Sequence, residues 1–243
     1  MNEVSRRVDV PALEPGAIHI FNVPLEAEAE EIARLFGLLS ADERERAERF
    51  RFERHRRRFV VCRGRLRVAL ARYLSTTPER VSFKYQPRGK PELAAEWSGE
   101  AIEFNVSHSH ELAVFGFCRD RPLGLDVEHL REMKTYRELA QRFFAVDECQ
   151  SLFALAGEQQ PTAFFRCWTR KEAMLKAFGT GLTFPLNKFV VTLGPDEPAQ
   201  LLSLSGQPTT AADWWLESWQ PTAGYISALA WQGPPAELVI RTW

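Results

Sequence analysis

Residues 124–128, Gly124-Leu125-Asp126-Val127-Glu128, carry two carboxylates two positions apart within an apolar run. Side-chain direction alternates along a strand, so Asp126 and Glu128 would point to the same face if the run is extended. The commoner explanation of such a pattern is a surface strand with an acidic outer face. Here the intervening Leu125 and Val127 predict a strand that is anchored in the core. The segment leaves a metal site and an acidic surface strand both open.

A second informative stretch spans residues 168–176, Trp168-Thr169-Arg170-Lys171-Glu172-Ala173-Met174-Leu175-Lys176. In a helix, Glu172 lies one turn from Trp168 and one turn from Lys176, so the three side chains share a face. A plain ion pair between Glu172 and Lys176 would explain the pattern and is worth only ~0.3–0.5 kcal/mol. The tryptophan predicts that this edge packs against the sheet, which would partly bury the carboxylate and require a partner for it. Together with the acidic pair of the first stretch, Glu172 would complete an oxygen-ligand site for a hard divalent cation that holds a phosphate.

The composition is ordinary for a folded protein, with 45% hydrophobic and 26% charged residues, and 243 residues suit one large or two small domains. The formal net charge of −1 gives no support for nucleic-acid binding. Four scattered cysteines without a Cys-x-x-Cys pair predict reduced thiols rather than a disulfide framework or a zinc site. The N-terminus lacks the apolar run of a signal peptide, and no apolar stretch is long enough to span a bilayer. We therefore expect a cytoplasmic protein that does not bind membranes.

Hydrophobic periodicity predicts a chain of mixed helices and strands, an α+β fold class. Alternating residues predict strands at 18–23, 81–85, 102–106, 112–118, 123–127, 188–193, 214–219, 225–231 and 238–243. Helical periodicity predicts helices at 26–39, 56–74, 137–143, 147–156 and 162–178. Ser40 and Glu43 form a capping box, which predicts a helix start there. Gly179-Thr180-Gly181 is typical of a helix end.

A shift of 105 residues superposes parts of the two halves of the chain. It aligns Asp42-Glu43 with Asp147-Glu148, Phe59 with Phe164, Cys62 with Cys167 and Leu70 with Leu175. The order of elements also matches, which predicts two pseudo-duplicated lobes, each a small antiparallel sheet packed with helices. We expect an N-terminal lobe at 1–120 and a C-terminal lobe at 121–243. Asp126 and Glu128 would then lie near the lobe interface, a preferred place for ligand clefts.

The segment Phe104-Asn105-Val106-Ser107-His108-Ser109-His110 gathers hydroxyls and imidazoles at the end of a predicted strand. A Ser–His nucleophile pair is rejected, because adjacent strand residues face opposite ways and no Gly-x-Ser-x-Gly turn accompanies them. His108 and His110 share a face, but their spacing matches no common zinc motif. We favour donors that hold a phosphate.

Two basic segments precede this motif. Gly89-Lys90-Pro91 puts a lysine in a tight turn, and Arg54-His55-Arg56-Arg57-Arg58 lies at the start of a predicted helix. An exposed, solvated surface is the simplest explanation of each. As functional groups they would bind the phosphates of a nucleotide or an acidic protein. Nucleic acid is disfavoured, since no aromatic platform is interleaved with the basic residues.

In this order and spacing the motifs resemble those of the 4′-phosphopantetheinyl transferases of the two-lobed, surfactin-synthetase-activating type. The resemblance covers most of the chain and rests on residues 89–91, 104–109, 124–128 and 168–173 with Lys176. It implies the α+β fold of that family. It also implies transfer of the phosphopantetheine arm of coenzyme A to a serine of an apo acyl or peptidyl carrier protein, with release of adenosine 3′,5′-bisphosphate.

The resemblance further implies roles for individual residues. Asp126, Glu128 and Glu172 would bind Mg²⁺, which bridges the pyrophosphate of coenzyme A. The base for the carrier serine would be Glu172 or a water held by the metal, and both stay open. Lys176, and with it Lys171, would stabilise the pyrophosphate and the leaving group.

By the same analogy, Lys90, Ser107 and His108 would contact coenzyme A, the last two near its 3′-phosphate. Arg46 and Arg58 lie where the family carries basic residues for the nucleotide phosphates. These five residues form the expected coenzyme A site together with the two lysines named above.

The sequence departs from the family pattern at Glu43, where some relatives carry a lysine, and this leaves the exact set of basic contacts open. Carrier proteins are typically acidic and helical, so an arginine-rich first lobe would attract one and speed its encounter. One-lobed relatives associate to form the interface that two fused lobes supply within one chain, which implies a monomer.

Two other classes of protein stay open. A Mg²⁺-dependent phosphohydrolase or nucleotidyl transferase would use the same three carboxylates and would turn over without a carrier protein. A non-catalytic coenzyme A or nucleotide-binding module would survive Asp126→Ala, whereas the transferase would lose its activity.

Overall fold

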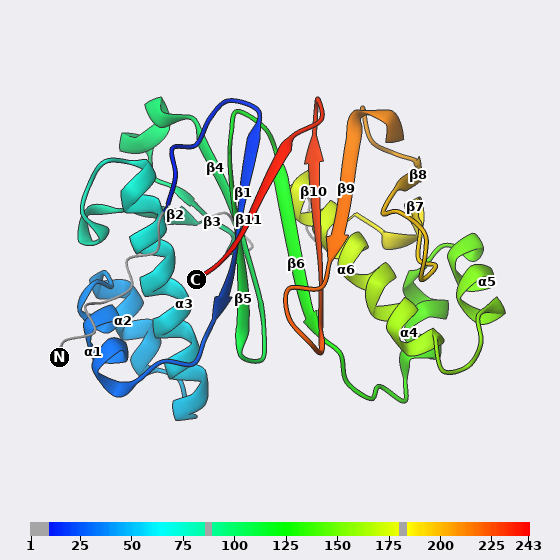
Figure 1. The fold of residues 1–243 in the computed structure, drawn as a ribbon, viewed down its shortest axis with the longest axis horizontal. Helices are drawn as coiled ribbons and strands as arrows, with labels where there is room; N and C mark the ends of the chain where they lie inside the picture. The colour runs from blue at the N-terminus through cyan, green and yellow to red at the C-terminus, as the bar shows by residue number, and fades with distance from the viewer. Residues whose placement is uncertain (1–9, 86–88, 180–183) are drawn as a thin grey trace.

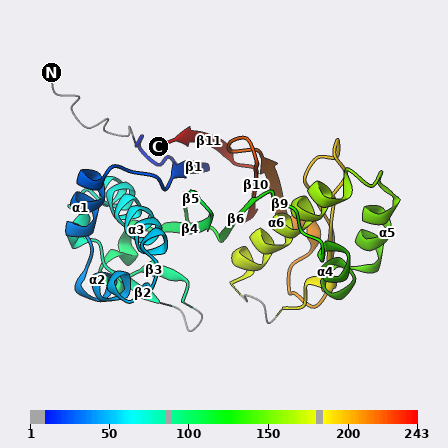
Figure 2. The ribbon, with the colours of Figure 1, turned by 90° about the horizontal axis from the view of Figure 1, so that it is seen from below.

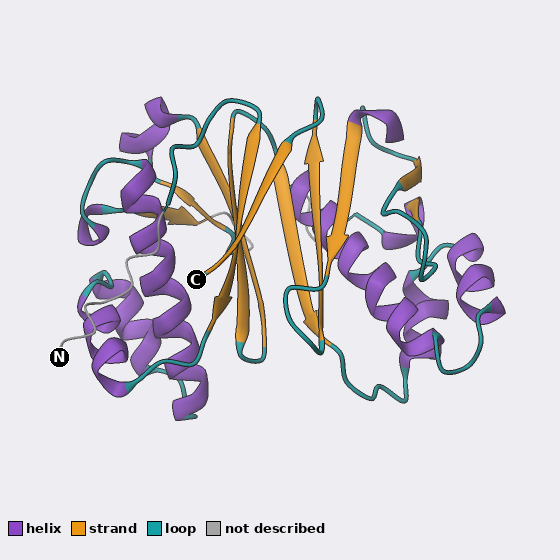
Figure 3. Cartoon of the chain, viewed as in Figure 1, coloured by secondary structure: helices purple, strands orange, loops and turns teal. Residues whose placement is uncertain are grey.

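The computed structural model describes residues 10–85, 89–179 and 184–243. Two sheets stand side by side in the middle of the molecule, and helices cover the outer side of each (Figures 1 and 3). Seen from below, the helices of the first and second halves of the chain lie at opposite ends, with the strands between them (Figure 2). The fold is α+β, as the periodicity predicts.

The first half contributes most of a sheet with the strand order β11-β1-β5-β4. Its central strand β5 (Leu112–Arg119) pairs antiparallel with β1 (Ala17–Pro24) and with β4 (Ile102–Ser109). A separate hairpin joins β2 (Phe83–Tyr85) to β3 (Pro91–Leu93). The helices are α1 (Ala29–Gly37), α2 (Ala41–Glu48) and α3 (Glu53–Tyr73), with short 3-10 helices η1 (Pro78–Arg80) and η2 (Ala95–Glu100).

The second half forms an antiparallel sheet with the order β6-β10-β9. Its strands are β6 (Leu123–His129), β9 (Trp214–Trp219) and β10 (Tyr225–Gln232), and a second hairpin joins β7 (Phe189–Val191) to β8 (Leu201–Leu204). The helices are α4 (Tyr136–Phe143), α5 (Val146–Ala154) and α6 (Gln160–Phe178), with η4 (Leu186–Lys188) and η5 (Ala211–Asp213). None of the helices in the described part of the chain has both the length and the apolar character to cross a bilayer.

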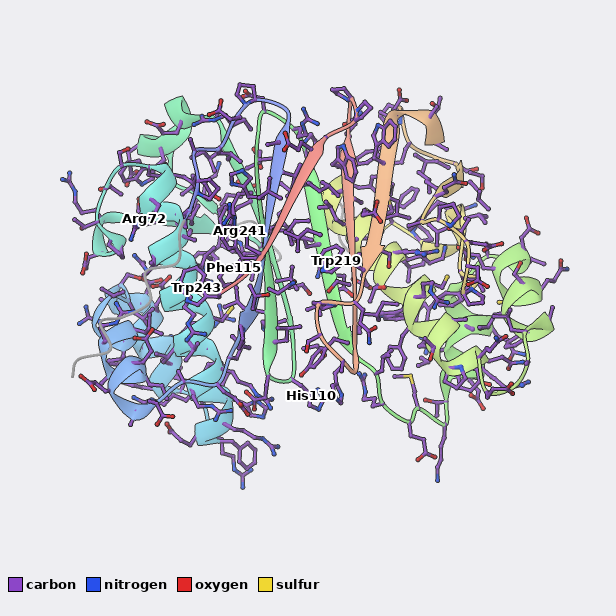
Figure 4. The ribbon with its side chains drawn as sticks, viewed as in Figure 1. Arg72, His110, Phe115, Trp219, Arg241 and Trp243 are labelled. Carbon is purple, nitrogen blue, oxygen red and sulfur yellow. The ribbon has the colours of Figure 1, made fainter. Side chains whose placement is uncertain are left out.

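The last strand, β11 (Glu237–Thr242), lies in the first sheet, where it pairs in parallel with β1. The expected range 121–243 for the second lobe is therefore wrong at its end, and the first sheet is not purely antiparallel. Arg241 and Trp243 accordingly lie on the side of the first half in Figure 4. The ring of Trp243 packs on Phe21 of β1, with 6.3 Å between the ring centroids. This apolar contact stabilises β11 at the edge of the first sheet.

Other boundaries differ from the predicted ones by a few residues. Helix α1 is shorter than the predicted helix 26–39, and α3 begins three residues before the predicted start at Arg56. Strand 81–85 is reduced to β2, and β3 was not predicted. The capping box of Ser40 and Glu43 is confirmed at the start of α2. Gly179 ends α6 in the left-handed conformation, with φ at 69°, while Thr180 and Gly181 lie outside the described residues.

The alternation of residues along each strand decides which layer it stabilises. On β1, Ile18 joins an apolar cluster between the two sheets, whereas Phe21 joins the cluster beneath α3. On β6, Leu125 and Val127 also join the cluster between the sheets. The residues that alternate with them, Asp126 among them, therefore face α6, as the period of two predicts.

The edge strands β4 and β6 join the two sheets through side chains. Three alternate residues of β4 each accept a backbone N–H from one of three alternate residues of β6. The pairs are Asn105 Oδ1 with Leu125 at 3.0 Å, Ser107 Oγ with Val127 at 3.3 Å and Ser109 Oγ with His129 at 3.1 Å. The Asn-x-Ser-x-Ser pattern of β4 thus forms a polar seam between the two halves of the molecule.

Candidate active site

A close approach of β6 to α6 builds the candidate site. A Cβ atom at Gly124 would lie 2.1 Å from the backbone oxygen of Ala173 in α6. Only a residue without a side chain fits such an approach of two backbones. Two residues further along β6, Asp126 meets the part of α6 that carries Glu172 and Lys176.

Asp126, Lys176 and Ser107 form the centre of the site. The Lys176 Nζ atom lies 2.8 Å from Oδ1 of Asp126 and 3.0 Å from Oγ of Ser107. The Ser107 hydroxyl donates to the same Asp126 oxygen at 2.9 Å. The second oxygen, Oδ2, is buried and accepts no hydrogen bond from the described residues. The Lys176 ammonium thus lies at the junction of the two halves. Beside it lies the Asp126 carboxylate, one of whose oxygens accepts no hydrogen bond from the described residues.

Glu172 is the third carboxylate of the expected set. Its pKa is raised from 4.5 to about 7, first because burial disfavours the charged form and then because Asp126 is negative. The pKa of Glu128 is raised as well, by burial and then by Asp126. The structure therefore brings the three carboxylates near enough to repel one another, and a cation among them would relieve that repulsion.

The chemistry of these residues fits a hard divalent cation. Three carboxylates supply the oxygen donors that Mg²⁺ prefers, and the buried Oδ2 of Asp126 is an acceptor that a cation would satisfy. The site is not preformed, however: among the described residues no group of three or more His, Cys, Asp or Glu side chains is arranged to hold a metal. Lys176 occupies Oδ1 of Asp126, and Arg131 lies 3.1 Å from Oε2 of Glu128. Each of these two cations contacts one oxygen of its carboxylate.

A cavity of about 530 Å³ opens on the first half's side of the seam. Ser109 of the seam lines it, so the cavity adjoins the carboxylate cluster. Basic and aromatic side chains make up much of the rest of the lining, among them Arg46, Arg58, Arg63, His55, His108 and Phe59. The guanidinium of Arg46 lies over the ring of Phe59, 5.1 Å from its centroid. A cavity of this size and charge suits a phosphorylated small molecule.

Neighbouring residues of β4 serve different sides of the seam. His108 is exposed to the cavity, yet its pKa is lowered, first by the protein that surrounds the ring and then by the positive charges of Lys176 and Arg58. Ser107 points the other way, into the seam, and its hydroxyl already bonds Asp126, Lys176 and a backbone N–H of β6. The expectation that Ser107 lies beside His108 at a phosphate is wrong, because adjacent strand residues face opposite ways.

Arg58 has a partner that the sequence did not indicate. Its Nη2 and Nε atoms lie 2.7 and 3.0 Å from Oε1 of Glu111, and Arg57 reaches the same oxygen at 2.6 Å. Two guanidiniums share one carboxylate, so a net positive charge stays at the edge of the cavity. Glu111 lies in the turn between β4 and β5, and a single glutamate in a turn carries no sequence pattern that would reveal this contact.

Lys90 does not line the cavity, although its neighbours Gly89 and Pro91 do. Its Nζ donates to the backbone oxygen of Lys176 at 3.2 Å. A cation near the last turn of a helix is favoured by the helix dipole. Lys90 therefore links the β2–β3 hairpin to α6, directly beside the carboxylate cluster.

Lys171 is not part of the cluster. Its side chain is fully buried, and its Nζ lies 2.7 Å from Oε2 of Glu148 and donates to the backbone oxygens of Leu186 and Phe189 at 2.7 and 2.6 Å. The expectation that Lys171 lies at the pyrophosphate is wrong, because consecutive helical residues point about 100° apart. Glu172 turns toward β6, and Lys171 turns into the core of the second half.

Trp168 also packs differently from the expectation. Its ring lies 6.0 Å from Phe143, 6.4 Å from Phe144 and 5.8 Å from Phe164, measured between centroids. These contacts hold α6 against the end of α4 rather than against the sheet. The apolar face of α6 is therefore wider than the sequence pattern alone indicates.

Comparison with known proteins gives consistent matches for both halves. Residues 122–230 match the model of the 4′-phosphopantetheinyl transferase superfamily, and residues 25–117 match that of the 4′-phosphopantetheinyl transferase N-terminal region. The 4′-phosphopantetheinyl transferase HetI of Nostoc sp. is 39% identical over 216 residues, which cover 89% of this chain and 88% of HetI. The 4′-phosphopantetheinyl transferase Sfp of Bacillus subtilis is 26% identical over 200 residues, which cover 82% of this chain and 85% of Sfp.

Among solved structures, the holo-[acyl-carrier-protein] synthase (AcpS) of Thermotoga maritima superposes with a TM-score of 0.36 and 16% identity. The superposition covers 47% of this chain and 64% of the other.

Proposed function

Because the chain belongs to the 4′-phosphopantetheinyl transferase family, we propose that it moves the phosphopantetheine arm of coenzyme A onto a serine of an apo acyl or peptidyl carrier protein. The observation that carries this proposal is the convergence of Asp126, Glu172 and Lys176 beside a cavity lined with basic side chains. Transfer from a pyrophosphate needs positive groups at the reacting phosphorus and at the leaving group. The cluster and the cavity supply these groups side by side.

The cavity would receive the nucleotide end of coenzyme A. Arg46 and Arg58 would bind its phosphates, with His108 as a further donor near the 3′-phosphate. A bound anion would raise the pKa of His108 and oppose the shift that the neighbouring cations cause. Lys90 lies between the cavity lining and α6, where it would face the pyrophosphate. Lys171 has no part in this site, since it is buried in the core of the second half.

Asp126, Glu128 and Glu172 would hold Mg²⁺ through their carboxylate oxygens. When bound, the ion supplies positive charge to the pyrophosphate and to the charge that develops on the leaving group. Asp126 is the best-prepared ligand of the three, because its Oδ2 is buried without a hydrogen-bond partner among the described residues.

In the proposed reaction, the oxygen of the carrier serine attacks the β-phosphorus of coenzyme A and forms a new O–P bond. The bond from that phosphorus to the bridging oxygen breaks, and adenosine 3′,5′-bisphosphate leaves with the electron pair. Glu172 accepts the serine proton, directly or through a water. Lys176 stabilises the charge on the leaving oxygen.

We further propose that the first lobe contacts coenzyme A and the carrier, while residues from 121 to the end of β10 supply the metal and catalytic groups. Arginines at the start of α3 would attract an acidic carrier protein. The seam between β4 and β6 joins the two lobes within one chain, which suits a monomer. All four cysteines are free thiols, which suits the reducing cytoplasm.

Intact mass spectrometry tests the proposal. The protein is incubated with coenzyme A, Mg²⁺ and apo carrier domains of the fatty-acid, polyketide and peptide-synthetase types. The expected result is the gain of one phosphopantetheine arm on a carrier and release of an equal amount of adenosine 3′,5′-bisphosphate. Asp126→Ala should abolish both, because it removes the central carboxylate.

Two outcomes would overturn the proposal in favour of the other classes. Cleavage of coenzyme A or a nucleotide without any carrier, and no carrier product, would indicate a phosphohydrolase or a nucleotidyl transferase. Coenzyme A binding that survives Asp126→Ala, with no turnover by the wild type, would indicate a binding module.

A further inference from the structure

Two serines of β4 contact the two carboxylates of β6 in the same way. Ser107 donates to Oδ1 of Asp126 at 2.9 Å and accepts the backbone N–H of the next residue of β6 at 3.3 Å. Ser109 donates to Oε2 of Glu128 at 3.3 Å and accepts the backbone N–H of the residue after it at 3.1 Å. Each hydroxyl therefore holds a carboxylate and the strand that carries it.

In each of the two carboxylates, a serine of the seam donates a hydrogen bond to one oxygen and not to the other. Oδ1 of Asp126 accepts from Ser107 and Lys176, whereas the buried Oδ2 accepts from none of the described residues. Oε2 of Glu128 accepts from Ser109 and from Arg131. Both of these contacts of Glu128 use Oε2, and neither uses Oε1. One oxygen of each carboxylate is thus available to a ligand.

Each hydrogen-bonded pair of residues across the seam is here called a rung. The third rung, between Asn105 and Leu125, shows that joining the strands does not require serine. Asn105 accepts the N–H of Leu125, and the residue before Leu125 is Gly124, which has no side chain to hold. An asparagine oxygen only accepts, whereas a serine hydroxyl accepts and donates at once. Serine stands at the two rungs that face a carboxylate, and asparagine stands at the rung that does not.

From this arrangement we infer that Ser109 is a positioning residue for the cation site, which holds Oε2 of Glu128 so that Oε1 faces the cation. Ser107 does the same for Asp126. The inference rests on the proposed function, since it assigns Glu128 as a ligand of the divalent ion. Ser109 lies outside the set of ligands, and its contribution is the orientation of Glu128. Partners that orient a metal ligand typically change metal affinity about 10–100-fold when they are removed.

Mn²⁺ binding in the presence of coenzyme A tests the inference, with free Mn²⁺ followed by electron paramagnetic resonance. Ser109→Ala is expected to raise the Mn²⁺ dissociation constant about tenfold or more. Ser109→Thr keeps the hydroxyl on a strand that accepts β-branched residues, so most of the affinity should return. Transfer by Ser109→Ala should recover toward the wild-type rate as Mg²⁺ is raised.

Ser218→Ala is the matched control. Its hydroxyl donates to the backbone oxygen of Ser227 at 2.9 Å within the same sheet, between β9 and β10, and bonds to no carboxylate of the described residues. This variant should bind Mn²⁺ as the wild type does, and the unfolding temperature of every variant is measured alongside.

Unchanged Mn²⁺ affinity in Ser109→Ala would overturn the inference, and so would an equal loss in Ser218→Ala, which would indicate a general loosening of the sheet. A folded Ser109→Thr variant as weak as Ser109→Ala would also overturn it. A wild type that binds Mn²⁺ but modifies no carrier would refute the proposed function instead, and the positioning of Glu128 would still be decided by the binding data.

Discussion

Glu43 in the first half and Glu148 in the second half lie 105 residues apart and make equivalent contacts. Each is the third residue of a short helix and accepts the backbone N–H of the residue that caps it, at 3.1 and 2.8 Å. Each also forms a buried ion pair with the long helix of its own half, Glu43 with Arg67 at 2.6 Å and Glu148 with Lys171 at 2.7 Å. The superposition predicted from the sequence therefore has a counterpart in the two lobes.

The two halves differ where the first strand of each meets the long helix. In the first half, Nδ1 of His19 on β1 lies 2.8 Å from the hydroxyl of Tyr73 on α3. The same shift of 105 residues puts Gly124 of β6 at the place of His19, and there the backbone of α6 contacts the strand. The two halves thus share a buried ion pair but differ in the contact between their first strand and their long helix. The missing side chain at Gly124 brings Asp126 and Glu172 together.

The largest effect is expected from breaking the buried ion pair of the second half. Lys171→Met leaves the Glu148 carboxylate buried without its partner, which should cost about 3–5 kcal/mol of unfolding free energy in denaturant titrations. Arg67→Met is the corresponding change in the first half and should cost less, because Arg63 lies 3.4 Å from the other oxygen of Glu43 and remains as its partner. Folded Lys171→Met should bind coenzyme A as the wild type does. A fully stable Lys171→Met variant that no longer binds coenzyme A would instead support a role for Lys171 at the phosphates.

Gly124→Ala tests the close backbone contact between β6 and α6, which distinguishes the second half from the first. The added Cβ would meet the backbone of α6 at 2.1 Å, and backbone cannot move aside as a side chain can. We expect a loss of about 3 kcal/mol, at the upper end of overpacking effects, together with a loss of transfer. Gly37→Ala in α1 is the control: among the described residues, no atom beyond its chain neighbours and the backbone of its own helix lies within 4 Å of the added Cβ, and stability should change by less than about 1 kcal/mol. Wild-type stability in Gly124→Ala would contradict the role of this contact.

Glu172→Gln tests the chemistry that the second half alone carries. It keeps the shape of the side chain and removes the charge, so transfer should fall at least about a hundredfold in a time course followed by mass spectrometry. Glu45→Gln in α2 removes a charge from an ion pair that is about 70% exposed and should leave the rate unchanged. A Glu172→Gln variant with the wild-type rate would exclude Glu172 as base and as metal ligand.

The last prediction concerns the pH dependence of stability in metal-free protein. The pKa of Glu172 is about 7 in the folded state, through burial and then the charge of Asp126, against an ordinary value of 4.5. The folded state therefore binds the proton more tightly than the unfolded chain, and the contribution of Glu172 to stability falls as the pH rises from 4.5 to 7. Glu172→Gln should gain stability relative to the wild type over that interval in urea titrations with a chelator present. A constant difference between the two across that interval would contradict the shifted pKa.

Local periodicity predicted much of this architecture, and its limits are instructive. The period of two placed Asp126 and Glu128 on one face, and the capping box located the start of α2 at Ser40. The orientation of Lys171 was not predictable, because helical spacing does not say which arc of α6 meets β6 and which meets the core. The contact of Glu111 with Arg58 joins residues 53 positions apart, and no local pattern encodes it.

By itself, the sequence determined most of the elements, the grouping of the two carboxylates on β6 and the family to which the chain belongs, since each depends on spacing along the chain. Only the tertiary structure decided that β11 joins the first sheet, that Ser107 and Ser109 bond the carboxylates across the seam, and that Lys171 serves the core. The physical reason is that these contacts arise between segments far apart in the chain. Which edge a strand pairs with, and which arc of a helix is buried, depend on the packing of the whole molecule.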